Sequence, residues 1–392
     1  MRKILFMISL CLFLINSHLL HAVTIRGNDL IWSTEDKSEF LYSMLGKGTG
    51  KKIWKIYNLK EQTGITLFYD TGIRPVWSWD GKIIAIARKD EIDLYTGPGK
   101  KKTWQLATEE LIDMDFSLDS KKMVYSDGAK IHIIDLEKGE NSFLVHGKKS
   151  YYINNDKNIL FFDENYKLSV IDKNFKIEQI TDKFIEKICP FKKENKFVFQ
   201  DEDKKRIKLF DLDIAAYQEI VIVKHDDEIT DFSLSYDNQF IIYAIKDREI
   251  FIVHIPTRLK VKVSEEENIF TPRLSRDNAF CSYEKQDKIF ITDISKFIQA
   301  FRLDDIFKIN VGSLQGVQIG TTIEVYEERR NPFSGQVIGM DANKFKGVLK
   351  VISVYDSFCY GRIDEEYKTK NPIEENDIAY WKEKEVMGVI SR

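Results

Sequence analysis

The chain has 392 residues, of which 43% are hydrophobic and 31% charged, so it has enough apolar material for a core and the length of two or three domains. Its 59 lysines and arginines are balanced by 62 aspartates and glutamates, which gives a formal net charge of −3. This balance excludes the strongly basic proteins that bind nucleic acid mainly through its phosphates.

The N-terminus predicts a secretory signal peptide. Two basic residues precede an apolar run at residues 4–14, and a polar stretch then leads to Ala22, after which we expect cleavage. Residues 1–22 would then be removed, and the protein would be periplasmic or secreted. An uncleaved membrane anchor is the alternative, although the apolar run is shorter than a usual span. No transmembrane segment is expected in the mature chain.

One sequence unit repeats seven times from Trp32 onward. Most copies contain a turn in which Ser or Asn stands two positions before an acid or amide, followed by two short apolar, β-prone runs. The acid or amide positions are Glu35, Asp80, Asp119, Asp156, Asn195, Asp237 and Asp277. Their spacing of 37 to 45 residues, with about four short strands per unit, predicts the blades of a β-propeller rather than a helical solenoid.

Each repeated turn is predicted to be a hairpin corner, because a Ser or Asn side chain can bond the local backbone and a following Gly or Asn tolerates left-handed geometry. Two segments compete to close the ring. Residues 23–26 can supply the outer strand of the last blade, or residues 300–303 can complete it in sequence. We favour the N-terminal segment, since residues 295–300 are typical of a short helical or irregular exit. Closure matters because an open strand edge invites mispairing.

The second copy resembles a known repeat. The segment from Trp77 through Ser78, Trp79, Asp80 and Gly81 to Lys82, followed by Ile83, Ile84 and Ala85, is similar to the WD40-like repeat of TolB-like periplasmic propellers, whose core is W-S-P-D-G-x-x-I-A-F. The resemblance covers roughly residues 28–296. It implies a propeller fold much more than an activity, since propellers host many unrelated functions.

From Asp305 the repeat ends, and short β runs separated by glycine turns predict a small antiparallel barrel. The turns at 316–320, 332–339 and 347–351 resemble the C-terminal domain of the flagellar assembly protein FlgT. The expected fold class is therefore all-β, a seven-bladed β-propeller (residues 23–298) followed by a small Gly-rich β-barrel (305–388). The two resemblances imply partners among envelope or surface-appendage proteins.

Catalytic and metal-binding motifs are sparse. The sequence has no G-x-S-x-G elbow, Gly-rich phosphate loop, H-E-x-x-H or paired Cys-x-x-Cys, so we expect no cofactor and no metal. Three dispersed cysteines, Cys189, Cys281 and Cys359, are predicted to be buried apolar residues rather than a disulfide framework or zinc site. His132 and His254 lie in repeat strands, where interior packing is the favoured interpretation.

The central channel is the expected site. The first strand of each blade precedes the corner, so residues six positions before the anchors are predicted to lie near one mouth of the channel, and bulky residues at the corners are candidate contact anchors. The candidate binding residues are Arg74, Trp79, Asp113, Asp231, Tyr236 and Arg276. The channel residues could instead satisfy local backbone groups or pair with one another.

These observations favour an exported, non-enzymatic protein-interaction or scaffold module of the bacterial cell envelope. One alternative is a propeller enzyme, a hydrolase or lyase, with a site at the channel mouth. A second is a structural subunit of an envelope or appendage assembly. The sequence names no partner.

Overall fold

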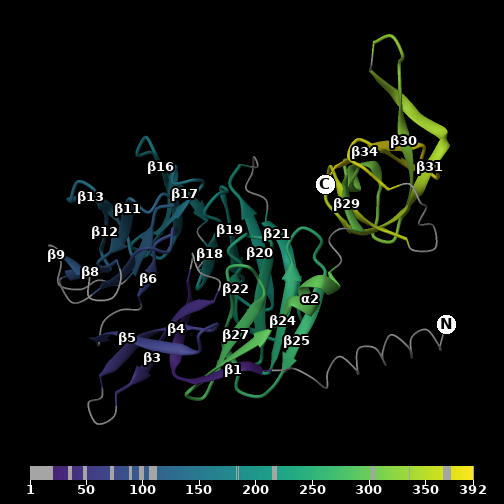
Figure 1. Cartoon of the computed structure of the whole chain (residues 1–392). Coiled ribbons are helices and arrows are strands. Elements are labelled where there is room, and N and C mark those ends of the chain that lie inside the picture. Colours follow the sequence, from purple (N-terminus) through teal and green to yellow (C-terminus); the bar gives the residue numbers. More distant parts are fainter. Residues whose placement is uncertain are drawn as a thin grey trace. The chain divides into compact units, whose positions relative to one another are not determined.

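The computed structural model describes residues 21–33, 38–46, 51–70, 75–87, 91–96, 101–105, 113–181, 183, 185–213, 219–301, 305–334, 336–364 and 372–391. The regular secondary structure of these residues is almost entirely β-strand, arranged as seven four-stranded sheets and one closed barrel (Figure 1). The predicted fold class, a seven-bladed propeller followed by a small antiparallel barrel, is therefore confirmed. The predicted signal peptide lies almost wholly outside the described residues.

The seven sheets are the propeller blades, and six of them follow the chain in order. Blade 1 consists of β2 (Asn28–Trp32), β3 (Glu39–Leu45), β4 (Lys52–Asn58) and β5 (Thr63–Asp70). Blade 2 consists of β6 (Val76–Trp77), β7 (Ile84–Ala87), β8 (Glu91–Tyr95) and β9 (Lys101–Gln105). Blade 3 consists of β10 (Asp113–Phe116), β11 (Lys122–Ser126), β12 (Lys130–Asp135) and β13 (Glu140–His146). Blade 4 consists of β14 (Ser150–Ile153), β15 (Asn158–Phe162), β16 (Leu168–Asp172) and β17 (Ile177–Thr181). Blade 5 consists of β18 (Ile188–Pro190), β19 (Lys196–Gln200), β20 (Arg206–Asp211) and β21 (Glu219–Lys224). Blade 6 consists of β22 (Ile229–Leu234), β23 (Phe240–Ile245), β24 (Glu249–His254) and β25 (Lys260–Glu265).

Blade 7 joins the two ends of the propeller sequence. It consists of β26 (Phe270–Leu274), β27 (Phe280–Lys285), β28 (Lys288–Asp293) and the N-terminal strand β1 (His21–Arg26), which pairs antiparallel with β28. The prediction that the N-terminal strand closes the ring is confirmed. The segment that follows β28 forms the short helix α2 (Ser295–Ala300), as expected for an exit from the ring.

The apolar core of the propeller lies between neighbouring blades. Each buried cluster draws on two consecutive sheets; the one between blades 7 and 1 contains Ile25, Ile289, Ile291, Leu30, Trp32, Phe40 and Tyr42. Similar clusters join blades 1 to 2, 2 to 3, 3 to 4 and 4 to 5. Because a blade buries its two faces against two neighbours, stability comes from closing the ring rather than from any one sheet.

The Ser-x-Asp corners form the predicted hydrogen bonds. In blade 6 the Ser235 hydroxyl donates to the Asp237 carboxylate at 2.6 Å and accepts from the backbone N–H of Phe240 at 2.8 Å. The serines of blades 2, 3 and 7 do the same at 2.7 to 2.9 Å; these are Ser78, Ser117 and Ser275. The residue after the aspartate is left-handed in all four copies, with φ of 73° at Gly81 and 59° to 60° at Ser120, Asn238 and Asn278.

Side chains of the corners also connect one blade to the next. Asp156 accepts from the Leu118 N–H at 2.7 Å, and the Ser120 hydroxyl accepts from the Asp80 N–H at 3.0 Å. Asn278 donates to Asp237 at 2.8 Å across the boundary between blades 7 and 6. The turn therefore shapes blades 2, 3, 6 and 7, and its side chains link blades 2 to 3, 3 to 4 and 6 to 7.

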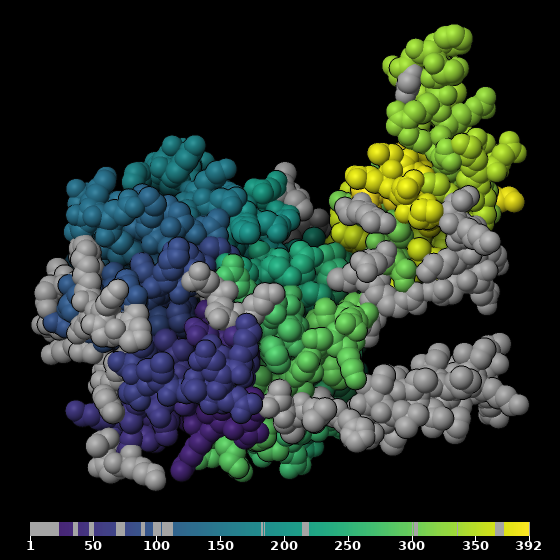
Figure 2. All heavy atoms as spheres, in the orientation of Figure 1, coloured from purple at the N-terminus to yellow at the C-terminus, as the bar shows by residue number. Residues whose placement is uncertain are grey.

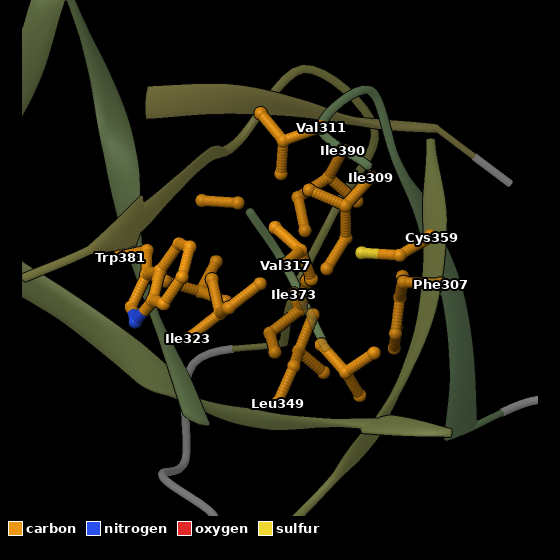
Figure 3. Packing of buried hydrophobic residues seen from close by; sticks show 13 residues of the cluster. Phe307, Ile309, Val311, Val317, Ile323, Leu349, Cys359, Ile373, Trp381 and Ile390 are labelled. Atoms are coloured by element: carbon orange, nitrogen blue, oxygen red, sulfur yellow. The ribbon is translucent and has the colours of Figure 1, made fainter. Parts of the chain in front are cut away.

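The C-terminal barrel closes in the strand order β29-β32-β31-β30-β33-β34. Its strands are β29 (Ile306–Ile309), β30 (Thr322–Arg330), β31 (Val337–Val354), β32 (Cys359–Ile363), β33 (Ile378–Trp381) and β34 (Val386–Ser391), with the short 3₁₀ helix η2 (Ser313–Gln315) between β29 and β30. The buried side chains that fill the interior, among them Phe307, Leu349 and Trp381, converge in Figure 3. Gly312 is required beside this core, because a Cβ there would lie 2.1 Å from the Tyr355 carbonyl oxygen.

The chain divides into two compact units, one comprising the described residues up to Ile252 with Lys262–Ser295, and the other Val253–Val261 with Lys296–Arg392. The sequence-based domain bounds of 23–298 and 305–388 stay predictions. Among the described residues, no helix has the length and apolar character needed to cross a membrane.

We predict that Ser235→Ala lowers the free energy of unfolding of the propeller by about 1–3 kcal/mol. The substitution removes two hydrogen bonds and leaves the buried Phe240 N–H without its side-chain acceptor. The measurement is the midpoint of urea unfolding. Ser142→Ala, at an exposed position of β13, is the matched control and should move the midpoint little. Equal midpoints for the two variants would contradict a structural role for the corner serine.

Ring closure gives a second prediction. Ile25→Asp should lower the melting temperature strongly, because it places an unpaired carboxylate in the core between blades 7 and 1. Thr24→Asp introduces the same charge one residue earlier, on the exposed face of β1, and should melt near the wild type. Thermal melting followed by limited proteolysis compares the two. Similar melting of both variants would show that β1 is dispensable for the ring.

Candidate functional site

A cavity of about 360 Å³ lies in the centre of the propeller, because residues of all seven blades line it. The lining residues are Trp32, Ser33, Trp79, Asp115, Tyr151, Ile188, Cys189, Pro190, Lys192, Ser233, Leu234, Ser235, Tyr236, Asn238, Leu274 and Arg276. Several of them belong to the corners that follow the first strand of each blade. The cavity is therefore the corner-side mouth of the central channel.

Three of the predicted site residues meet at this mouth. The rings of Trp79 and Tyr236 stack with centroids 4.2 Å apart and an interplanar angle of 16°, and the Arg276 guanidinium lies 4.4 Å from the Tyr236 ring centroid. The Tyr236 hydroxyl also donates to the Trp79 carbonyl oxygen at 3.3 Å. Trp79 and Tyr236 come from blades 2 and 6, which are not neighbours, so the stack spans the mouth.

All three residues occupy the same place in the repeat, the middle position of Ser-x-Asp. The hydroxyl and carboxylate on either side are used to hold the turn. The middle side chain takes no part in these bonds and lines the channel mouth. A stacked aromatic pair with an arginine against one face is favourable through ring contact and cation–π attraction, and it leaves all three residues only partly exposed.

The wall of the cavity carries a charged pair that the sequence analysis missed. The Lys192 ammonium bonds the Asp115 carboxylate, which also accepts from the Tyr152 N–H at 2.8 Å. Both charged side chains are mostly buried. A signal was available, because β10 places Asp113 and Asp115 in a strand that is otherwise apolar. The sequence signal for Lys192 was weaker, since this residue lies in the most degraded copy of the corner.

Asp113 and Asp231 do not line this cavity, although both belong to first strands. Burial acts to raise the pKa of Asp231, but Arg273 and Lys187 outweigh it, and the pKa lies below its ordinary value. Lys187 bonds one carboxylate oxygen, and Arg273 donates to the other at 3.3 Å. Asp231 is thus an ion-paired carboxylate at neutral pH.

Asp113 differs sharply in its electrostatics. Desolvation raises its pKa to about 6, and the carboxylate of Asp115 adds to the rise, while Lys149, the Tyr151 hydroxyl and the Met114 N–H oppose it. A carboxyl group with such a pKa can exchange a proton near neutrality. Arg74, the remaining candidate, lies outside the described residues.

Cys281 and Cys359 are buried, as predicted, whereas Cys189 is partly exposed and lines the cavity. The prediction of a buried residue was wrong for Cys189, because this residue lies in β18, the first strand of blade 5, and lines the central cavity. Desolvation raises the pKa of the Cys189 thiol, although Lys187 and Arg273 oppose it. A protonated thiol is a weak nucleophile.

His254 and His132 make local contacts within the blades. His254 is buried with its Nδ1 2.8 Å from the Thr257 hydroxyl, and His132 stacks on Tyr125 with ring centroids 4.9 Å apart. Within the described part of the chain, no three histidine, cysteine or acidic side chains are grouped so that they could hold a metal ion.

The fold is a seven-bladed β-propeller followed in the chain by a closed β-barrel. The propeller domain of Cps50 (Swd1) from Myceliophteria thermophila is similar in structure, with a TM-score of 0.54 and 11% sequence identity over 70% of this chain and 100% of that domain. This similarity concerns the fold. No protein-family model matches the chain, and no curated protein matches its sequence.

Asp113 provides a testable pH dependence. Its pKa is higher in the folded than in the unfolded chain, so its contribution to stability is complete below about pH 4 and is lost as the pH rises to about 6. Asp113→Asn removes this loss and should be more stable than the wild type above pH 7, by up to roughly 3 kcal/mol. Urea unfolding from pH 4 to 8 measures the difference.

Asp231→Asn is the matched control and has the opposite sign. Because the pKa of Asp231 is lower in the folded than in the unfolded chain, its ionised carboxylate stabilises the folded state above the unfolded pKa, and this stabilisation is lost in acid. The variant should therefore be less stable than the wild type at neutral pH. If Asp113→Asn also loses stability at pH 8, the surroundings of Asp113 do not disfavour its ionised form, and the prediction is wrong.

Proposed function

We propose that this chain is an exported, non-enzymatic interaction module of the bacterial cell envelope, which binds a partner protein at the corner-side mouth of its propeller. The proposal rests on the stack of Trp79, Tyr236 and Arg276 across that mouth. The propeller fold supports the broader role of a protein-interaction scaffold. Export is inferred from the N-terminal sequence pattern alone.

Tryptophan, tyrosine and arginine are the residues that most often dominate binding energy at protein interfaces. Here they are held together before any partner arrives, since each belongs to a hydrogen-bonded corner and the rings support one another. A preorganised group loses less side-chain entropy on binding than three separate surface residues would. The adjacent cavity, with its aromatic and charged walls, can receive a protruding side chain or loop of the partner.

An enzyme with a site in the channel is the second candidate, and the raised pKa of Asp113 is the observation that favours it. Such a site would also need an activated nucleophile or a second acid–base group near Asp113. Asp231 is committed to Lys187 and Arg273, and desolvation works against the thiolate form of Cys189. The interaction module therefore accounts for more of the geometry.

The proposed surface predicts the effect of Trp79→Ala combined with Tyr236→Ala. Recovery of the partner by crosslinking in cells and mass spectrometry should fall about tenfold or more, because central aromatic anchors are lost. The melting temperature should fall only modestly, since the stack contributes on the order of 1 kcal/mol beyond its buried area. N-terminal sequencing of the recovered protein tests export and should begin at Val23.

The matched control is Tyr166→Ala combined with Phe175→Ala, which removes two exposed aromatic residues from turns of blade 4. This variant should recover the partner as well as the wild type does. An equal loss in both double variants, or no loss in the first, would place the contact surface elsewhere. Hydrolytic activity of the purified protein that disappears in Asp113→Asn would favour the enzyme.

A further inference from the structure

The hairpin formed by β30 and β31 extends beyond the barrel (Figures 1 and 2). β30 pairs with β33 only over Glu324, Val325 and Tyr326, and the recorded pairing of β31 with β32 begins at Leu349. Between the barrel and the turn, β30 and β31 are paired with each other as far as Arg330 and Val337. A two-stranded ribbon of this kind adds little to a barrel core, which suggests another role.

The end of this hairpin is strongly apolar on its surface. Phe333 is 97% exposed, and Ile338 and Val337 are 55% and 46% exposed. These three large exposed side chains, within six residues, make up the apolar tip of the hairpin. Exposed apolar groups gathered in this way mark a surface that becomes covered by another molecule.

The backbone of the turn is satisfied from within. The Asn331 side-chain oxygen accepts from the N–H groups of Phe333 and Ser334 at 2.8 and 3.2 Å, the Asn331 N–H donates to the Gln336 carbonyl at 2.8 Å, and the Gln336 N–H reaches the Ser334 hydroxyl at 3.4 Å. Pro332 has no N–H to satisfy. The described N–H groups of this turn can therefore leave water without losing a partner.

The charges change along the hairpin. Farther from the tip, the strands carry their own ion pairs, Glu327 with Lys344 at 2.6 Å and Glu328 with Arg330. From residue 329 to residue 338 there are two arginines and no carboxylate, and Arg330 is the one paired with Glu328. The tip is thus apolar at its end, with the exposed Arg329 just behind it.

We propose that the β30–β31 hairpin binds to the surface of a membrane that contains anionic phospholipid. Phe333, Val337 and Ile338 enter the boundary between headgroups and acyl chains, and the exposed Arg329 lies at the phosphates, while Arg330 keeps its ion pair with Glu328. Interfacial segments bury their apolar side chains to a depth of ~5–10 Å, which is the depth proposed for the tip.

An apolar pocket on another protein would also cover Phe333. The exposed Arg329 and the absence of carboxylates from residues 329–338 favour a lipid surface, where the arginine gains from the negative headgroups. With one short apolar tip, binding should be weak and reversible.

The test is cosedimentation of residues 21–392, which contain every described strand, with vesicles of phosphatidylcholine alone or mixed with equal phosphatidylglycerol. Omitting residues 1–20 removes the apolar N-terminal run at residues 4–14, which could bind lipid itself. The wild type should bind the mixed vesicles and much less to phosphatidylcholine. Phe333→Ser should reduce binding about tenfold or more, and Arg329→Gln about fivefold.

Phe175→Ser is the matched control, because Phe175 is 71% exposed in a propeller turn and its loss should leave vesicle binding unchanged. In a Phe333→Trp variant, brominated lipids should quench more fluorescence than in the wild type, which reports insertion of the tip. Both Phe333 variants should keep the wild-type melting temperature. Absence of binding to the mixed vesicles, or equal binding by Phe333→Ser and the wild type, would overturn the proposal.

Discussion

The hydrogen bonds of the Ser-x-Asp corner are the local interaction on which the propeller depends. One serine hydroxyl donates to the aspartate and accepts from the backbone where the next strand begins, so the direction of the second strand is set before the sheets pack. The neighbouring corner supplies further bonds, as between Asp156 and the Leu118 N–H. Ring geometry thus follows from a turn of a few residues repeated around the molecule.

The middle position of the Ser-x-Asp turn can vary without loss of the turn's hydrogen bonds. The outer residues of Ser-x-Asp are needed for hydrogen bonding, whereas the middle residue is not. Trp79, Tyr236 and Arg276 stand at that position and line the mouth of the channel, and Leu118 occupies it in blade 3. A repeat can thereby keep its fold while the surface at the channel mouth changes from one protein to another.

The hairpin of the barrel follows the same physical logic as the corners. Through the side chain of Asn331 its turn satisfies the N–H groups of Phe333 and Ser334, and the Phe333 side chain is 97% exposed. The two surfaces differ in chemistry. The channel mouth combines stacked aromatic rings, an arginine and an ion pair, which suits a protein partner, whereas the hairpin tip is apolar with the exposed Arg329 behind it, which suits lipid.

The sequence by itself determined the propeller, the barrel and the closing strand β1, because these depend on periodic turn chemistry and short-range strand patterns. It also nominated Trp79, Tyr236 and Arg276 as unusual corner residues. Only the tertiary structure decided that they meet, since 157 residues separate the two rings and the ring of blades brings them together. The Asp115–Lys192 pair, the partly exposed Cys189 and the raised pKa of Asp113 likewise depend on burial between distant strands, which local patterns do not encode.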